Sequence, residues 1–506
     1  MAELPATLAA LLEPAAYPHE VRQVRLVETH ISWVLLTGLF AYKIKRPVAY
    51  PFVDLRSVER RRFYCDEELR LNRRFAPELY VETCDVTEEG GKARIGGSGR
   101  VIERCVKMRQ FERANELDRL LEHHEIEATT LETFGRELAD LHARLPVAQA
   151  GDTWGSAGQV HKVVLENLHQ YLKGAAAARF TPREDVGARI EQRLRELASD
   201  IDTRRANGRV RECHGDLHAR NVVLIANRLV AFDCLEFEPA FRWIDVAEEV
   251  ALLVADLQAR DRTREAHAFL GGYLAQSGDF ALLRLLDLYV AHRALTRAKV
   301  AALEAQHDEF DALSGTAAAA LEEKRPTLIL MAGVSGSGKT WLARRVAPDI
   351  AAVHLRSDVE RKRLAGLDEL ASSRSRTGDG LYASDITERV YRHLAKCAED
   401  ALSGGYSVIV DATFLKRSQR NEFATLAARL GVTLKVIVSE APLEVLRERI
   451  GRRQLAAADA SEANESVLDW QLAHQEPIAA AEHLHVIRIS ATASNPAGET
   501  LRVLTP

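Results

Sequence analysis

The chain has 506 residues, of which 47% are hydrophobic and 28% are charged, and its formal net charge is −5 at pH 7. This length exceeds what one hydrophobic core supports and predicts two or three domains, while the composition is that of an ordinary globular protein. The charge excludes a global attraction to nucleic acid or to anionic membranes and leaves room only for a local basic groove.

The six cysteines are scattered and form no CxxC pair. This argues for a reducing compartment and against a zinc site or a disulfide framework. No apolar run approaches the roughly 18 residues of a membrane-spanning helix, and the first residues, MAELPATLAALLEP, make a poor signal peptide. We therefore expect a cytoplasmic protein without a membrane partner.

The first 110 residues favour a strand-rich unit that contains one charged amphipathic helix. A short helix comes first, and the Gly-rich stretch 88–99 is expected to be a hairpin tip rather than a phosphate loop. The predicted strands are 21–28, 32–45, 79–86 and 101–108, and the predicted helix is 55–75.

This order is typical of a protein-kinase-like small lobe, in which a strand lysine pairs with a helix glutamate and grips the α- and β-phosphates of ATP. Lys43 in the sequence FAYK fits the lysine position, with Lys45 as the second choice, and Glu68 or Glu67 would be the partner. Met108, at the end of the last strand, joins the predicted nucleotide-binding residues. Alternatively, these charges form a solvated surface. Because there is no GxGxxG, the loop 29–32 would have to cover the phosphates.

Residues 150–325 are mostly helical in pattern, but 213–239 predict a loop, two short strands joined by an Ala-Asn turn, and an acidic loop. His214, Asp216 and Asn221 match the H-x-D-x-x-x-x-N pattern of a kinase catalytic loop. Asp216 would accept the proton of a substrate hydroxyl, and Asn221 and Asp233 would bind Mg²⁺. The alternative makes these three side chains turn and surface residues.

HGDLHARN (214–221) resembles the catalytic loop of the aminoglycoside phosphotransferase and choline kinase group. FDCLEFEPAFRWIDVA (232–247) resembles that group's metal-binding segment and the second aspartate after it, here Asp245, which supports the catalytic loop. The resemblance covers about residues 20–310, although Leu235 stands where many relatives have Gly. It implies a bilobal α+β kinase-like fold with a helical large lobe and ATP-dependent phosphorylation of a small-molecule hydroxyl.

An aminoglycoside acceptor would need an acidic cleft, because such acceptors are polycations. The resemblance does not imply that acceptor, and charges of this kind more often form a solvated helix face. The acidic residues in question are Glu236, Glu238, Glu248, Glu249 and Asp256.

We place a domain boundary at Arg325-Pro326. The first domain would span 1–325, with a small lobe at about 20–110 and a large lobe at about 111–325, and the second would span 326–506. In the second domain strands and helices alternate, which predicts an α/β fold with a parallel sheet and ligands at the carboxyl ends of its strands.

The second domain opens on TLILMAGVSGSGKT (327–340), a buried strand followed by GxxxxGKT and the start of a helix. This context is that of a phosphate-binding loop, whose only rival is a chance Gly-rich turn. Lys339 would reach the β- and γ-phosphates of ATP, and Thr340 would hold Mg²⁺. The predicted loop residues are Gly333, Ser335, Gly336, Ser337 and Gly338.

Two aspartates follow later strands of this domain. Asp358, after the second strand, is placed to take a proton from an acceptor hydroxyl, or it caps the following helix. Arg356 and Arg361 are candidates for an anionic substrate. Asp411 ends the strand of SVIVDAT and would support the metal ion or the attacking group.

The segment RERIGRR leads into QLAAADASEAN and predicts an arginine-bearing lid over the transferring phosphate. Arg449 and Arg452 are the predicted catalytic arginines, and Arg447 and Arg453 lie in the same segment. Alternatively, helical pairs with nearby glutamates explain part of this charge. The segment 371–380 is Ser-, Gly- and Arg-rich and is expected to be mobile.

GxSGSGKT, SDxxR, VIVDAT and an Arg-rich lid together resemble the P-loop kinases that include zeta toxins, polynucleotide 5′-kinases and gluconate-type kinases. The complete order resembles bacterial fusions of a phosphotransferase-like domain with such a kinase. We expect two ATP·Mg²⁺ sites that phosphorylate small-molecule hydroxyls. Two alternatives stay open: a polynucleotide 5′-hydroxyl kinase at the C-terminus, or one domain that binds ATP and regulates the other.

Overall fold

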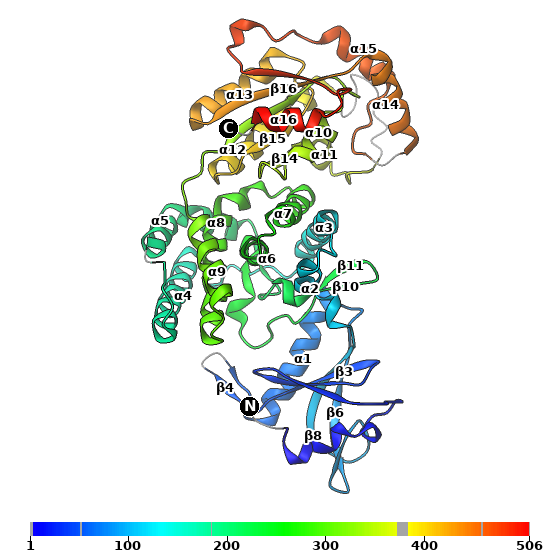
Figure 1. The fold of residues 1–506 in the computed structure, drawn as a ribbon, viewed down its shortest axis with the longest axis vertical. Coiled ribbons are helices and arrows are strands. Elements are labelled where there is room, and N and C mark those ends of the chain that lie inside the picture. The colour runs from blue at the N-terminus through cyan, green and yellow to red at the C-terminus, as the bar shows by residue number, and fades with distance from the viewer. Residues whose placement is uncertain (1–3, 51–52, 184, 372–382, 457–458, 505–506) are drawn as a thin grey trace. The chain divides into compact units, whose positions relative to one another are not determined.

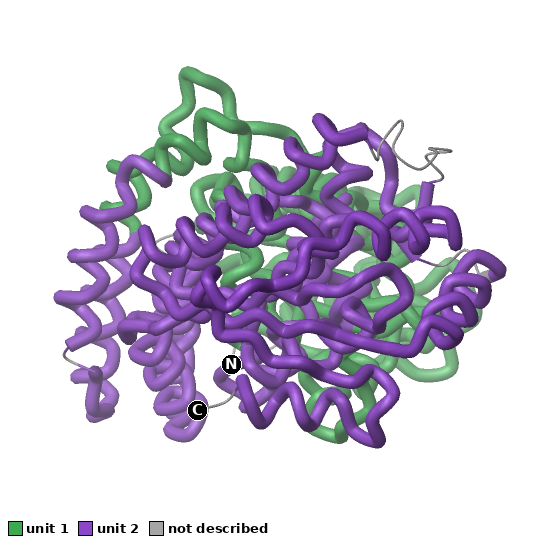
Figure 2. Tube along the Cα trace, turned by 90° about the horizontal axis from the view of Figure 1, so that it is seen from above, with its two compact units in different colours: residues 1–130, 141–163, 201–256 green, residues 131–140, 164–200, 257–506 purple. Residues whose placement is uncertain are grey.

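The computed structural model describes residues 4–50, 53–183, 185–371, 383–456 and 459–504. Nearly all of the segment expected to be mobile, 371–380, therefore lies outside the described residues. The chain forms two compact units, which Figure 2 distinguishes by colour. Unit 1 comprises residues 1–130, 141–163 and 201–256, and unit 2 comprises residues 131–140, 164–200 and 257–506.

Unit 1 contains an antiparallel sheet of six strands in the order β1-β2-β3-β8-β6-β7, with helix α1 packed against it (Figure 1). The α1 helix, Val58–Phe75, begins where the Ser57 side chain accepts a hydrogen bond from the Arg60 amide. The strands are β1 (Arg25–Glu28), β2 (Ser32–Leu36), β3 (Phe40–Lys45), β6 (Tyr80–Glu89), β7 (Lys92–Ile95) and β8 (Arg100–Arg109).

The prediction of one strand over 32–45 is wrong, because this stretch is the hairpin β2–β3. The turn is closed by the Thr37 amide, which donates to the Phe40 carbonyl at 2.9 Å. Gly38 adopts φ +94°, a conformation that favours glycine and that interrupts the strand. The predicted lysines therefore lie on β3, between β2 and β8 in the sheet.

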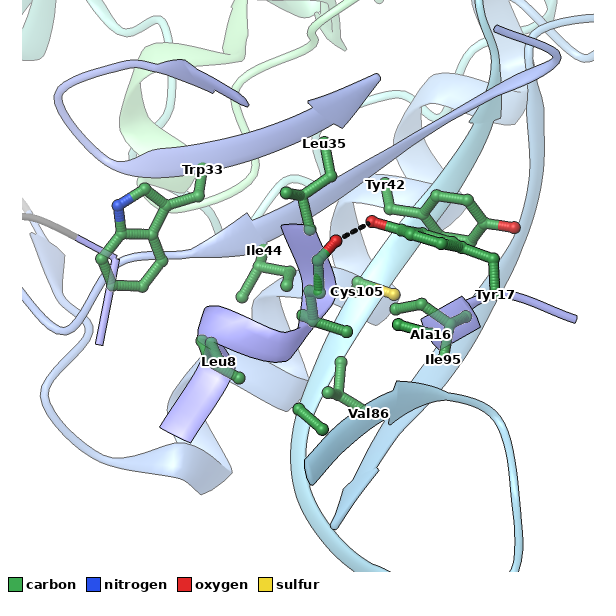
Figure 3. Packing of buried hydrophobic residues seen from close by; sticks show 12 residues of the cluster. Leu8, Ala16, Tyr17, Trp33, Leu35, Tyr42, Ile44, Val86, Ile95 and Cys105 are labelled. Atoms are coloured by element: carbon green, nitrogen blue, oxygen red, sulfur yellow. Dashed lines mark hydrogen bonds between the residues drawn. The ribbon is translucent and has the colours of Figure 1, made fainter. Parts of the chain in front are cut away.

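The core of the small lobe lies on one face of this sheet (Figure 3). Trp33 and Leu35 of β2 and Tyr42 and Ile44 of β3 are buried there, together with residues of the N-terminal 3₁₀ segments. Tyr17 donates a hydrogen bond to the Leu11 carbonyl at 2.7 Å. Because side chains alternate along a strand, the two lysines of β3 point to the opposite face.

The predicted catalytic segment is a hairpin of β10 (Val222–Ile225) and β11 (Arg228–Ala231). The predicted Ala-Asn turn is confirmed, since Ala226 and Asn227 both have positive φ, as a tight two-residue hairpin turn requires. Before and after it, β9 (Val210–Glu212) pairs with β12 (Trp243–Asp245), which leads directly into helix α6 (Val246–Ala259). Both ends of the segment are thus fixed to regular structure.

The part of the chain between β8 and β13 is mostly helical. Helix α8 ends at Leu303 and α9 begins at His307, with Ala305 at φ +56° between them. The helices are α2 (Leu117–Glu122), α3 (Ala128–Arg144), α4 (Ala157–Ala178), α5 (Asp185–Ala206), α7 (Thr263–Ser277), α8 (Leu283–Leu303) and α9 (His307–Ala320).

The C-terminal part of unit 2 is the predicted parallel sheet, with strand order β14-β15-β13-β16-β17. Asp411 of β15 lies beside Met331 of β13 and Arg356 of β14, so the carboxyl ends of these strands meet in one row. The strands are β13 (Thr327–Ala332), β14 (Val353–Arg356), β15 (Val408–Asp411), β16 (Thr433–Glu440) and β17 (Val486–Ser490). The helices are α10 (Lys339–Val346), α11 (Ser357–Leu364), α12 (Ser384–Ser403), α13 (Arg417–Leu430), α14 (Leu443–Ala456), α15 (Glu465–His474) and α16 (Pro496–Leu504).

Unit 2 therefore joins the late helices of the first predicted domain to the second sheet. Arg363 of α11 donates to the Gln276 carbonyl at 2.7 Å, and the Tyr406 hydroxyl donates to Asp287 at 2.6 Å. The domain boundary at Arg325-Pro326 therefore stays a prediction. None of the helices in the described ranges combines the length and the apolar character needed to cross a lipid bilayer.

Candidate active sites

The first candidate site lies in unit 1 and is centred on Lys43 of β3. Its ammonium contacts Glu68 of α1 at 2.8 Å and also Asp233, which follows the β10–β11 hairpin. The neighbouring Lys45 binds Glu68 as well, together with Glu236. The structure thus brings both candidate lysines to Glu68.

These charges lie in a protected environment that strengthens their pairing. Lys43 is 7% exposed, and Lys45 and Glu68 are fully buried. Burial alone would lower the pKa of Lys43, but the carboxylates of Asp233 and Glu68 more than reverse this and hold that pKa well above its ordinary value. Lys43 is therefore a permanent cation, as a phosphate-binding lysine must be. The alternative, in which these charges form a solvated surface, is wrong for Lys43, Lys45 and Glu68.

The predicted catalytic loop is held together by its own polar groups. The Asn221 amide nitrogen donates to the Asp216 carbonyl at 3.0 Å and to the Asp216 carboxylate at 3.1 Å. The His218 ring lies 3.3 Å from the same carboxylate. The Phe232 amide donates to the Asn221 carbonyl at 2.9 Å, which ties the start of the hairpin to its end. Asp216, Asn221 and Asp233 are therefore brought together, as the sequence predicts.

Asp233 has a left-handed backbone with φ +65°, a conformation that costs an L-residue about 1 kcal/mol or more. Its amide donates to the Tyr80 hydroxyl at 3.1 Å, and its carboxylate is held by Lys43. Strain of this kind persists where surrounding contacts over-determine the geometry, and it is common at functional sites. Tyr80 is a site residue that sequence reasoning missed, since nothing marks a strand tyrosine as a partner of a distant loop.

Acidic residues of α6 hold the backbone of the catalytic loop through hydrogen bonds. Glu249 accepts hydrogen bonds from the amides of His214 at 2.7 Å and Gly215 at 3.0 Å, and Asp256 accepts from the Ala219 amide at 2.8 Å. The expectation of a solvated helix face is wrong for four of the five acidic residues, and only Glu238 is half-buried. The other four, which are at most 7% exposed, are Glu236, Glu248, Glu249 and Asp256. The carboxylates of Glu249 and Asp256 accept from backbone amides, and that of Glu236 contacts the Lys45 ammonium.

Asp245 and Met108 lie in the surroundings of this site. Asp245 forms a two-pronged ion pair with Arg204, with both N–O distances 2.8 Å, in keeping with its expected structural role. Met108 lies opposite Ala41 and Tyr80 in the sheet and packs against the cluster that contains Tyr80. Its contact with nucleotide stays a prediction.

The second candidate site is a cavity of about 1110 Å³ within unit 2, at the carboxyl ends of the parallel strands. Its wall brings together Lys339, Thr340, Asp358, Asp411 and Arg449. The loop residues Ser335, Gly336 and Gly338 also line it. This meeting of residues from α10, α11, β15 and α14 is the arrangement predicted for a P-loop kinase site.

Two of the predicted loop residues, Gly333 and Ser337, do not line the cavity. Gly333 adopts φ +135°, and a Cβ atom there would lie 2.6 Å from the Ser439 carbonyl. The Ser337 carbonyl accepts a hydrogen bond from the Ser439 hydroxyl at 2.7 Å. Both residues therefore shape the loop from the side of β16.

The P-loop lysine is turned back onto its own loop, where the Lys339 ammonium donates to the Val334 carbonyl at 2.9 Å. Burial lowers the pKa of Lys339, and the nearby carboxylates of Asp411 and Asp358 oppose that shift. A bound polyphosphate would supply further negative charge at this position. The ammonium is thus placed to exchange a carbonyl for phosphate oxygens.

Thr340 and Asp411 form the predicted metal-binding pair, with the threonine hydroxyl donating to the carboxylate at 2.6 Å. The His354 ring contacts the same carboxylate oxygen at 3.2 Å. Burial raises the pKa of Asp411, but His354 and then Lys339 lower it to about 2. Sequence reasoning missed His354, although its place two residues before the end of β14 puts it near the row of strand ends.

Asp358 is the second residue of α11, and the N-cap position belongs to Arg356. The capping alternative is therefore not supported. Arg356 is engaged within the protein, since it pairs with Glu369 at 3.0 Å and Asp459 at 3.0 Å. Arg361 lines the cavity and donates to the Thr387 hydroxyl at 3.3 Å.

Of the predicted lid arginines, only some face the cavity. Arg449 lines it and donates to the carbonyls of Gly336 at 3.4 Å and Ala491 at 3.1 Å. Arg453 also lines it, one helical turn further along α14. Arg452 is off the cavity wall, with a side chain 79% exposed and paired with Glu448 at 2.6 Å. The structure favours Arg453 over Arg452, because residues four apart share a helix face.

Comparison with known proteins matches both parts of the chain. The model of the Phosphotransferase enzyme family matches residues 60–288, and that of an AAA domain matches residues 328–478. An uncharacterised protein of Mycobacterium tuberculosis is 30% identical over 464 residues, which cover 88% of this chain and 91% of that protein. A protein of Mycobacterium bovis matches to the same extent.

Solved structures similar to parts of the chain include three kinases. A choline/ethanolamine kinase family protein from Mesorhizobium loti is 13% identical, covering 62% of this chain and 94% of its own, with a TM-score of 0.38. A sugar kinase from Janibacter is 23% identical, covering 36% and 93%, with a TM-score of 0.28. The APS kinase CysC of Mycobacterium tuberculosis is 21% identical, covering 36% and 99%, with a TM-score of 0.27.

Because the mycobacterial matches cover 88% of this chain, they extend over both of its parts. The chain belongs to their family and consists of a phosphotransferase-family domain followed by a P-loop kinase-like AAA domain.

Proposed function

We propose that the protein is an ATP-dependent phosphotransferase with two kinase-type sites, each of which moves the γ-phosphoryl group of ATP to a hydroxyl of a small-molecule acceptor. One observation carries the proposal. Two structurally unrelated sites each combine a buried lysine with oxygen donors of the kind that Mg²⁺ prefers. In each, an aspartate stands near that set, Asp216 in the first and Asp358 in the second.

In the first site, Lys43 would bind the α- and β-phosphates and give up its contact with Asp233, while Glu68 keeps the ammonium oriented. Asp233 and Asn221 supply the carboxylate and amide oxygens that would hold Mg²⁺. Asp216 would accept the proton of the attacking hydroxyl. One hydrogen bond from Asn221 and the contact with His218 hold that carboxylate in place beforehand.

In the second site, the Lys339 ammonium would leave the Val334 carbonyl for the β- and γ-phosphates. The hydroxyl of Thr340 and the carboxylate of Asp411 would hold Mg²⁺, which when bound neutralises charge on the phosphates. Asp358 would accept the proton of the acceptor. Arg449 would stabilise the charge of the transferring group, since it reaches the loop from α14.

The proposal is tested by incubating the full chain with ATP, Mg²⁺ and a panel of hydroxyl metabolites and recording a mass gain of one phosphate. Asp216→Asn and Asp358→Asn should each remove a different product. Asp311→Asn and Asp469→Asn, which change exposed aspartates in the same chain, serve as matched controls. A product that survives both active-site substitutions would contradict the assignment of the two bases.

A 5′-hydroxyl oligonucleotide belongs in the same panel. Binding of a nucleic acid weakens much more steeply with salt than binding of a small acceptor, because each contacted phosphate releases counterions. A labelled oligonucleotide product that disappears in Asp358→Asn and falls sharply with salt would replace the small-molecule acceptor at the second site.

A further inference from the structure

The side chain of Gln471 reaches from helix α15 into the phosphate-binding loop. Its Oε1 atom accepts a hydrogen bond from the backbone amide of Ser335 at 2.7 Å. The residue is 7% exposed, and both it and Ser335 line the cavity. A backbone amide of the loop is thus occupied by a side chain from a helix that follows about 130 residues later.

The position of this amide identifies the phosphate that would replace the glutamine. Ser335 follows Val334, whose carbonyl holds the Lys339 ammonium at 2.9 Å. A P-loop lysine reaches the β- and γ-phosphates, and the loop amides donate to phosphate oxygens. Gln471 therefore occupies the end of the loop that receives the terminal phosphates of ATP.

Packing fixes the face of α15 that carries Gln471. Leu468 belongs to one hydrophobic cluster with Val334 of the loop and with Leu446 and Ile450 of α14. Asn464 caps the start of the helix, and its side chain accepts from the Val467 amide at 3.0 Å. Since Val467 and Gln471 are one turn apart, they share the buried face.

We propose that Gln471 is a γ-phosphate-binding residue that makes the second site prefer ATP over ADP. A γ-phosphate oxygen takes over the Ser335 amide, and the freed carboxamide turns its NH₂ group toward the same phosphate. ADP leaves the contact between Gln471 and Ser335 intact, because it has no γ-phosphate to displace the side chain. The inference rests on the proposed role of this cavity as an ATP site.

The test measures nucleotide affinity at the P-loop alone, in the full chain, as protection of amides 333–340 from hydrogen exchange during titration with ATP·Mg²⁺ or ADP·Mg²⁺. Gln471→Glu keeps the shape but sets a negative charge against the γ-phosphate, and Gln471→Met keeps the volume but cannot donate. Both should weaken ATP about tenfold or more, the effect of losing a hydrogen bond to a charged group, and leave ADP within about threefold.

Gln475→Glu, with the same charge change at the exposed end of α15, is the matched control and should leave both affinities unchanged. If the Gln471 variants change ATP and ADP by the same factor, or change neither, the residue only packs and the inference is wrong. Lys339→Ala separates this failure from that of the proposed function. Protection by ATP that persists in Lys339→Ala would show that the cavity is not the P-loop ATP site.

Discussion

Replacing Lys45 by Met tests whether the buried charges of unit 1 form one interdependent network. Met has a volume similar to that of Lys but no charge, so the substitution removes the ammonium with little change in packing. In the native protein Lys45 is fully buried and contacts Glu68 and Glu236, whose side chains are 0% and 3% exposed. The variant leaves both carboxylates in place without that cation.

The loss of stability in Lys45→Met depends on which cation each carboxylate still contacts. Glu68 keeps its contact with Lys43 at 2.8 Å, whereas Glu236 loses the cation that its carboxylate contacts. Removing one partner of a buried ion pair costs about 3–5 kcal/mol, because an uncompensated charge stays buried. Lys45→Met should therefore destabilise unit 1 by about that amount. Adding Glu236→Gln should recover most of the loss, because the charge is then removed as well.

The cost should also shrink as pH falls. Burial raises the pKa of Glu236, and Lys45 opposes that shift. Without Lys45 the pKa rises further above its unfolded value, so the carboxyl of the variant takes up a proton in the folded state as the solution is acidified. A neutral carboxyl needs no ammonium partner. The difference from the wild type is thus largest above that raised pKa and smallest below it.

Hydrogen exchange of the α1 amides measures this locally, which matters because a chain of several units does not unfold in one step. Lys107→Met is the matched control, since Lys107 lies in the same sheet and pairs with the 53% exposed Glu82 at 2.9 Å. That surface pair should contribute less than about 1 kcal/mol. Equal, small effects of the two substitutions, or no rescue by Glu236→Gln, would refute the reasoning.

Three further outcomes are expected at the second site. Because the pKa of Asp411 is lowered to about 2, roughly 2 kcal/mol of stability should be lost as pH falls from about 4 to about 2, and urea unfolding of Asp411→Asn should lack this loss. Arg449→Ala should lower turnover of ATP about tenfold or more, while Arg452→Ala, at an exposed position, should leave it within about twofold in the same assay. Gly333→Ala should abolish protection of the loop by ATP, because its Cβ would lie 2.6 Å from a carbonyl oxygen.

Much of the second site could be predicted because its residues lie at fixed offsets from strand ends. The loop of Lys339, the strand that ends at Asp411 and the helix that begins before Asp358 are all local patterns, and parallel strands bring their carboxyl ends together. The sequence does not show which face of α14 is turned toward the cavity. Arg452 and Arg453 are adjacent in sequence, and only packing decides which one faces the cavity.

In unit 1 the local patterns of Lys43 and of the segment from His214 to Asn221 were sufficient to predict the site. The residues that hold these groups in place could not be predicted. Glu249 and Asp256 look like surface charges on a helix, and their roles arise from amides far away in sequence. The hairpin at Gly38 was missed, since the flanking residues continue the apolar pattern of a strand. The periodicity of apolar residues does not indicate long-range hydrogen bonds or a tight turn at a single glycine.

The most direct test of two ATP sites is the stoichiometry of ATP binding to the full chain by equilibrium dialysis. The wild type should bind two molecules of ATP per chain. Lys339→Ala and Lys43→Met should each bind one, and the double variant should bind none. If Lys339→Ala alone abolishes all binding, or if the wild type binds a single ATP that Lys43→Met leaves unaffected, the account of two sites is contradicted.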